Sequence, residues 1–69
     1  MKYEPIDIEK LSDLSVLKDH VIYCDDFEKL NKQDQDTVYG YCRQHANIPA
    51  CRENLKQIRY AVSKIYFGY

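Results

Sequence analysis

The strongest constraint on the fold is a narrow apolar stripe in the last third of the chain. Its members recur in steps of four, three, four, three and four residues, a period of about 3.5 that indicates one buried face of an α-helix. Pro49 suits the first turn of such a helix, and Phe67-Gly68 suits its end. These signals predict an amphipathic helix over residues 49–66. The stripe consists of Cys51, Leu55, Ile58, Val62, Ile65 and Tyr69.

Helical spacing also recurs in the first third of the chain. From Ile8 to Cys24 the apolar residues are three or four positions apart, with charged residues between them. This pattern predicts a helix over residues 7–23. The tripeptide Val21-Ile22-Tyr23 favours a β-strand by itself, but a lone three-residue strand without a partner is not expected.

Two further helices are predicted in the middle of the chain. Residues 25–28 read Asp-Asp-Phe-Glu, a helix-start pattern that predicts a short helix over residues 26–30. Asn31 is an N-cap for a helix over residues 32–45, with Asp34 in its first turn where the helix dipole favours negative charge. Gly40 weakens this helix. Its inner stripe is thin and partly polar: Val38, Tyr41, Cys42 and His45.

These segments predict an all-α fold in one domain that spans residues 1–69. A chain of 69 residues hides only about 60% of its unfolded surface, so it has room for one small core and no separate catalytic domain. The predicted architecture is a small three-helix bundle, or a four-helix bundle when the short helix at 26–30 is counted. The predicted core is Leu11, Leu14, Leu17, Val21, Phe27, Leu30, Val38, Leu55, Ile58, Val62 and Ile65.

The net charge of −1 conceals two halves of opposite sign. Residues 1–36 hold five Lys and ten Asp or Glu, whereas residues 37–69 hold five Lys or Arg and one Glu. The halves either attract each other within the fold or present two surfaces to different partners. The N-terminus lacks a secretory pattern, no run of about 18 apolar residues exists, and an odd cysteine count is a poor disulfide framework. We expect a cytoplasmic protein with reduced thiols and no membrane contact.

The cysteines and histidines form the first candidate site. Cys24, Cys42, His45 and Cys51 are candidate ligands, with His20 as a fifth. Their helical spacings permit a tetrahedral zinc site. The competing interpretation is that buried cysteines act as small apolar residues. A cysteine nucleophile with His20 or His45 as its base is a further hypothesis, but no third orienting group is indicated. We expect no enzyme activity and no cofactor, with zinc as the alternative.

The second candidate site is the outer face of the C-terminal helix. Rotating this helix by 100° per residue places Tyr60 among basic residues, opposite the apolar stripe. Seven tyrosines are also more than a small core accommodates, and tyrosine is enriched at interfaces. The sequence therefore predicts a small non-enzymatic regulator or inhibitor whose partner is another protein or a second copy of the chain. The predicted partner-binding residues are Arg52, Lys56, Arg59, Tyr60 and Lys64.

The same face supports a second hypothesis, a small helix-turn-helix-like DNA-binding regulator. Residues 41–55 resemble the helix, turn and Pro-initiated helix found near the start of winged-helix repressor domains. The resemblance covers under a quarter of the chain and lacks the recognition helix and the wing. In size, acidity and tyrosine content the chain is also similar to compact helical inhibitors of phage and plasmid origin. A structural zinc-binding helical module is the third hypothesis.

Overall fold

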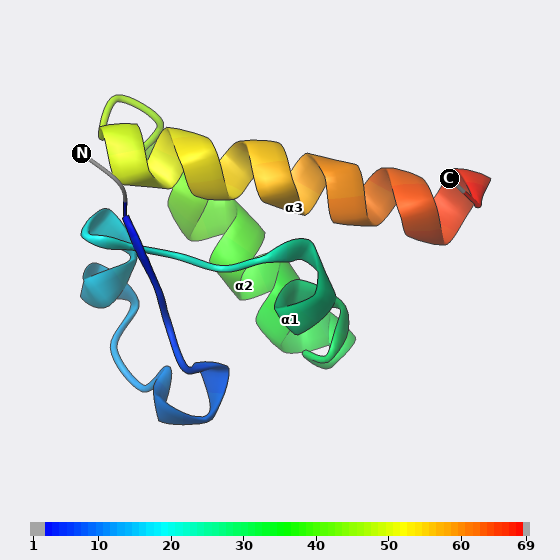
Figure 1. Ribbon diagram of the computed structural model, residues 1–69, viewed down its shortest axis with the longest axis horizontal. Helices are drawn as coiled ribbons and strands as arrows, with labels where there is room; N and C mark the ends of the chain where they lie inside the picture. The colour runs from blue at the N-terminus through cyan, green and yellow to red at the C-terminus, as the bar shows by residue number, and fades with distance from the viewer. Residues whose placement is uncertain (1–2, 69) are drawn as a thin grey trace.

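The computed structural model describes residues 3–68. Figure 1 shows α3 along one side of the molecule, with the other elements packed beneath it. Within residues 3–68, no helix combines the length and the apolar character needed to cross a membrane. The elements in chain order are β1 (Glu4–Pro5), η1 (Ile8–Lys10), η2 (Leu14–Lys18), β2 (His20–Val21), α1 (Cys24–Glu28), α2 (Lys32–Gln44) and α3 (Pro49–Phe67).

The two long helices begin and end where their capping residues allow. The side chain of Asn31 accepts a hydrogen bond from the Asp34 N–H at 2.8 Å and so caps α2. Pro49 occupies the first turn of α3, and Gly68 ends the helix in the left-handed conformation at φ 73°. These bounds lie within one residue of the expected ranges 32–45 and 49–66, while α1 begins two residues before the expected 26–30.

The predicted helix over residues 7–23 is wrong. Two short 3₁₀ turns replace it, each begun by an aspartate whose carboxylate accepts the backbone N–H two residues further on. Asp7 binds the Glu9 N–H at 3.1 Å, and Asp13 binds the Ser15 N–H at 2.9 Å. This local bonding competes with an α-helix. The bond from Ser15 also lowers the pKa of Asp13.

The all-α three-helix or four-helix bundle is also wrong. β1 and β2 pair as a two-stranded parallel sheet, with Glu4 opposite His20 and Pro5 opposite Val21. The Ile6 N–H extends the pairing to the Val21 carbonyl at 3.1 Å. A strand beginning at His20 therefore does have a partner, contrary to expectation. The fold is a mostly helical small globule with this sheet at one side.

One buried polar residue fastens the sheet to α3. Asn54 is fully buried, and its Oδ1 accepts the backbone N–H of Ile22. Its Nδ2 donates to the carbonyls of Leu17 at 3.3 Å and His20 at 2.8 Å. Asn54 thus satisfies backbone groups on both sides of β2 that would otherwise be buried without partners.

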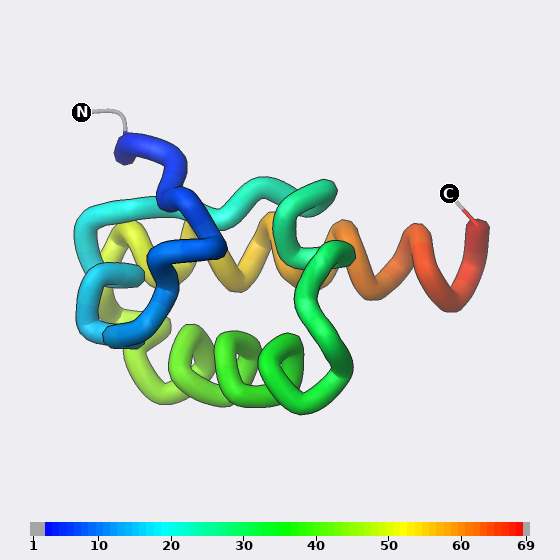
Figure 2. Tube along the Cα trace, turned by 90° about the horizontal axis from the view of Figure 1, so that it is seen from below, coloured from blue at the N-terminus to red at the C-terminus, as the bar shows by residue number. Residues whose placement is uncertain are grey.

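The core lies between α3 and the elements beneath it. Most predicted core residues are buried or half-buried, but Ile65 is 54% exposed because the last turns of α3 extend past the other elements. Figure 2 shows this projecting end in the perpendicular view. Tyr69, the last member of the predicted stripe, lies outside the described residues. The buried residues that the sequence analysis did not place in the core include Ile22, Ala50, Asn54 and Ala61.

Candidate interaction surface

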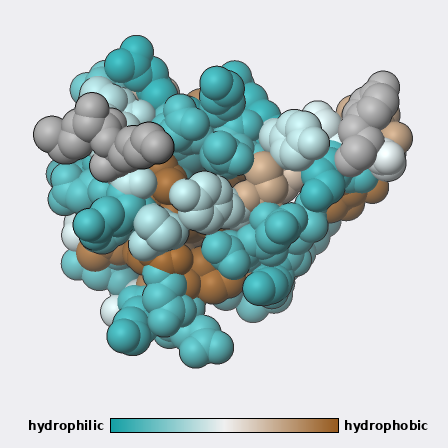
Figure 3. Space-filling view, viewed as in Figure 1, coloured by the Kyte–Doolittle hydropathy of each residue, from teal (hydrophilic) through white to brown (hydrophobic). Residues whose placement is uncertain are grey.

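The outward face of α3 changes character along its length. Its first half exposes cations, and its second half exposes large apolar side chains, with Ile65 at 54% and Tyr66 at 74%. At 1.5 Å per residue α3 is about 28 Å long, so its end reaches beyond the shorter helices. Figure 3 shows hydrophobic side chains at this projecting end, and a second hydrophobic area in the lower middle of the same face, with hydrophilic side chains around both.

The cations of the first half surround a shallow depression of about 430 Å³, here called the basic hollow. Its floor is apolar, formed by Ala46 and Leu55. None of its three cations forms an ion pair with a described residue, since the ion pairs within residues 3–68 involve Lys29 and Lys64. The basic hollow therefore carries a local positive charge that no carboxylate of residues 3–68 neutralises through an ion pair. Its cations are Arg52, Lys56 and Arg59.

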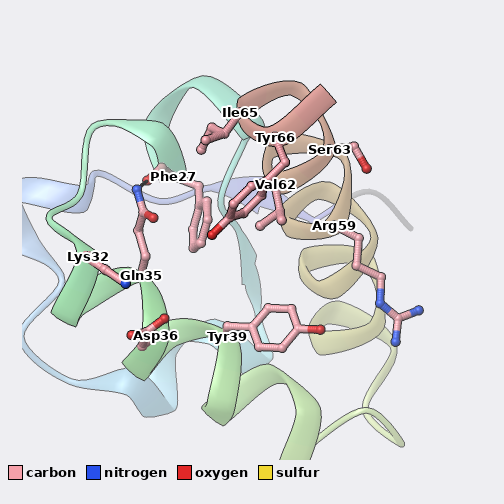
Figure 4. A pocket seen from close by; sticks show the side chains of 10 residues that line it. All are labelled: Phe27, Lys32, Gln35, Asp36, Tyr39, Arg59, Val62, Ser63, Ile65 and Tyr66. Carbon is pink, nitrogen blue, oxygen red and sulfur yellow. Dashed lines mark hydrogen bonds between the residues drawn. The ribbon is translucent and has the colours of Figure 1, made fainter. Parts of the chain in front are cut away.

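A larger apolar groove of about 720 Å³ lies between α2 and the second half of α3. Phe27 of α1, which is 1% exposed, lies at its inner end. Figure 4 shows Phe27, Val62 and Tyr66 gathered together, with Tyr39 extending from α2 toward α3. The groove is completed by Lys32, Gln35, Asp36, Arg59, Ser63 and Ile65.

Arg59 joins the two features because it lines both of them. The basic hollow and the apolar groove are therefore consecutive stretches of one track along the α2 side of α3. In Figure 4 the Arg59 guanidinium points away from the apolar side chains. The track is cationic toward the start of α3 and apolar toward its end.

The structure separates the other two predicted partner-binding residues from this track. Lys64 turns toward α1, where its ammonium lies 3.6 Å from Asp25 and 3.8 Å from Glu28. The charges of Glu28 and Asp25 raise the pKa of Lys64. The same ammonium lies 5.9 Å from the centre of the Tyr60 ring. Tyr60 remains 57% exposed, but it lines neither the basic hollow nor the apolar groove.

The candidate zinc ligands are engaged in separate local contacts. The single S–H of Cys24 is shared between the backbone and side-chain oxygens of Gln57, each 3.1 Å from its Sγ, and Cys51 donates to the Leu17 carbonyl at 3.7 Å. His45 stacks on Tyr41 with ring centres 4.1 Å apart. Among residues 3–68, no three His, Cys, Asp or Glu side chains lie together as a metal site would require.

The cysteines are also poorly placed for the alternative nucleophilic role. Within the described part of the chain, no hydrogen bond joins a cysteine thiol to His20 or His45. The buried Nδ1 of His20 has no hydrogen-bond partner there. Burial raises the pKa of all three thiols, for Cys42 from 9.0 to about 12. The thiolate is the reactive form, so this burial disfavours the reactive state of the three cysteines at neutral pH.

The raised pKa of Cys42 predicts a loss of stability in alkali. Its thiol is protonated in the folded protein but ionises near pH 9 when the chain unfolds, so its contribution is complete below pH 9 and lost between pH 9 and about 12. We expect the stability advantage of the wild type over Cys42→Ala to shrink across this range in urea unfolding experiments. An advantage that stays constant with pH would contradict the prediction.

Part of this surface was foreseeable from the sequence. The helical rotation grouped Arg52, Lys56 and Arg59, and the structure exposes all three around one hollow, but the rotation did not reveal the apolar groove. The available signal was helix length: a helix predicted over 49–66 is longer than one predicted over 32–45, so its end must extend beyond it.

The chain matches no protein-family model, and neither curated proteins nor solved structures show a significant similarity to it.

Proposed function

We propose that this protein is a small non-enzymatic regulator or inhibitor that acts by protein–protein contact through the track along the α2 side of α3. The observation that carries the proposal is the exposed end of α3, where Ile65 and Tyr66 border a groove that ends on buried Phe27. Exposed apolar patches with polar rims are typical of interaction sites. Aromatic residues and arginine are also enriched at interfaces, and both are present along this track.

The cysteines support a binding role in the cytoplasm. All three are free thiols whose pKa is raised by burial. They therefore remain protonated at neutral pH, whereas cysteine catalysis requires a thiolate. Free thiols also suit a reducing compartment. The proposal accordingly places the protein in the cytoplasm with another protein as its partner.

A helix-turn-helix-like DNA-binding regulator is the second candidate. It is favoured by the unit formed by α2, the turn at residues 45–48 and α3, which exposes three cations that no described carboxylate neutralises. Such cations suit contact with phosphates. Against this candidate, Asp36 lines the adjoining groove and the net charge is −1, whereas DNA-binding domains usually carry a positive excess.

Affinity capture with matched variants tests the protein-binding role. Tagged wild-type protein, Tyr66→Ala and Tyr23→Ala are incubated with lysate of the source cells, and retained proteins are quantified by mass spectrometry. We expect Tyr66→Ala to reduce retention of the partner by roughly tenfold, as truncation of an interface anchor does. Tyr23→Ala removes an exposed tyrosine that lines neither feature and should retain the partner fully.

Two results would count against the proposal. Equal retention by Tyr66→Ala and Tyr23→Ala would mean that the end of α3 is not the contact surface. Retention that disappears after nuclease treatment would favour the DNA-binding candidate, as would a salt-sensitive gel shift abolished by Arg52→Glu with Lys56→Glu.

A further inference from the structure

The charges along the track indicate the sign of the charge that its partner carries. The basic hollow presents three cations above Ala46 and Leu55, without a carboxylate among its lining residues. Elsewhere on α3, Lys64 is already paired with Glu28 and Asp25. Exposed charges of one sign attract and orient a partner of the opposite sign. The first half of α3 is therefore suited to carboxylates.

The second half of the track suits a different kind of partner side chain. The apolar groove ends on Phe27 and is bordered by Val62, Ile65 and Tyr66. Lys32 and Arg59 contribute two positive charges to its rim, and Asp36 contributes one negative charge. The space between these rim charges suits an aromatic or aliphatic side chain, whose burial there is favourable.

From this polarity we infer that the track binds an acidic amphipathic helix of another protein, with its carboxylates over the basic hollow and an apolar anchor in the apolar groove. The inference rests on the proposed function and names its partner by chemistry. The α3 residues of the two features span 52–59 and 59–66, so their midpoints are seven residues apart. That offset is about 10 Å, or two helical turns, and defines the spacing of carboxylates and anchor on the partner. Amphipathic helices commonly bind in this way, with the side chains of one apolar face placed in a hydrophobic groove.

The other occupants fit the track less well. A nucleic acid offers uniformly spaced phosphates, which satisfy the basic hollow but leave the apolar groove unfilled and approach Asp36. A second copy of the chain would have to offer a helix with carboxylates beside an exposed apolar anchor. Within residues 3–68, α2 exposes no large apolar side chain, and the only one at α1 is its N-cap Tyr23. At five residues, α1 is about 7 Å long, which is too short to place carboxylates and an anchor about 10 Å apart.

Selection from a random peptide library tests the inference without a known partner. The probe is a phage-displayed library of peptides of about 16 residues, long enough for four helical turns, selected on the immobilised full chain. We expect enrichment of peptides in which Asp or Glu residues lie about seven positions from an aromatic or aliphatic residue. An enriched peptide is then synthesised with a fluorophore, and its binding is measured by anisotropy.

Charge reversal supplies the decisive comparison. Arg52→Glu with Lys56→Glu should weaken binding roughly tenfold or more and remove its salt dependence. A peptide with its acidic residues replaced by lysine should recover binding to this variant, which shows that the variant is folded. Tyr66→Ser should weaken binding of both peptides, whereas Lys10→Glu, an exposed reversal on η1, should leave binding unchanged.

Each alternative has its own result. Enrichment of peptides without acidic residues, or failure of the swapped peptide to recover binding, would overturn the inference. So would a dimer in analytical ultracentrifugation that Tyr66→Ser dissociates, or a gel shift with random-sequence duplex DNA that the double reversal abolishes. If lysate capture succeeds while the library yields no acidic peptides, the partner chemistry is wrong and the proposed function stands. If acidic peptides are selected but no protein is captured, the proposed function fails.

Discussion

Replacing Asn54 with alanine is expected to reduce the free energy of unfolding by about 2–4 kcal/mol, because a buried backbone group left without a hydrogen bond costs about 1–3 kcal/mol. The substitution removes the acceptor for the Ile22 N–H and the donor to the Leu17 and His20 carbonyls. A chain of this length has a total stability of roughly 3–10 kcal/mol. We therefore expect a large decrease in the urea midpoint, measured by far-UV circular dichroism.

The control for this prediction is the same substitution at an exposed site. Asn47 is exposed in the turn before α3, so Asn47→Ala should change stability by no more than about 0.5 kcal/mol. Asn54→Asp adds a second comparison. It keeps an acceptor for the Ile22 N–H but sets a buried carboxylate against two carbonyl oxygens, so it should be at least as destabilising as alanine at neutral pH. Equal midpoints for Asn54→Ala and Asn47→Ala would contradict the role assigned to Asn54.

The first third of the chain shows why apolar spacing misled the sequence analysis. Ile8, Leu11, Leu14 and Leu17 are each three residues apart. On an α-helix such steps rotate by 300°, so the four side chains spread over half the circumference instead of sharing a face. A spacing of three fits 3₁₀ turns, in which side chains at i and i+3 align, and the structure has two such turns here. Asp7 and Asp13 begin them through local hydrogen bonds that the periodicity does not register.

The last helix was predicted more successfully because its signals agree with one another. Pro49, the 3.5-residue stripe and Gly68 all specify the same helix, and its outward cations follow from rotation alone. Long-range contacts were beyond this reasoning. Nothing local indicates that Lys64 pairs with α1. Nothing local marks Asn54 either, because its hydrogen-bond partners lie more than thirty positions away in sequence.

Replacing Phe27 with alanine is expected to cost about 3–5 kcal/mol, the range for truncating a buried aromatic side chain. Phe27 is 1% exposed and is the only buried residue of the five-residue helix α1. Without its ring, α1 loses its main apolar contact with the core. Against a total stability of roughly 3–10 kcal/mol, we expect Phe27→Ala to lower the urea midpoint more than Asn54→Ala does, with loss of cooperative unfolding at the lower end of that range. Phe27→Leu, which keeps most of the apolar volume, should lose only about 1 kcal/mol.

Truncating an exposed aromatic residue shows whether the stability cost of Phe27→Ala comes from the burial of the ring or from its size. Tyr66 borders the same groove but is 74% exposed, so Tyr66→Ala should alter stability by about 0.5 kcal/mol or less. If Phe27→Ala strongly lowers the urea midpoint while Tyr66→Ala does not, Phe27 is a structural support for the groove and Tyr66 is available for contact. Similar costs for the two would mean that Tyr66 is packed in solution, and the exposed end of α3 would then be part of the core instead of a binding surface.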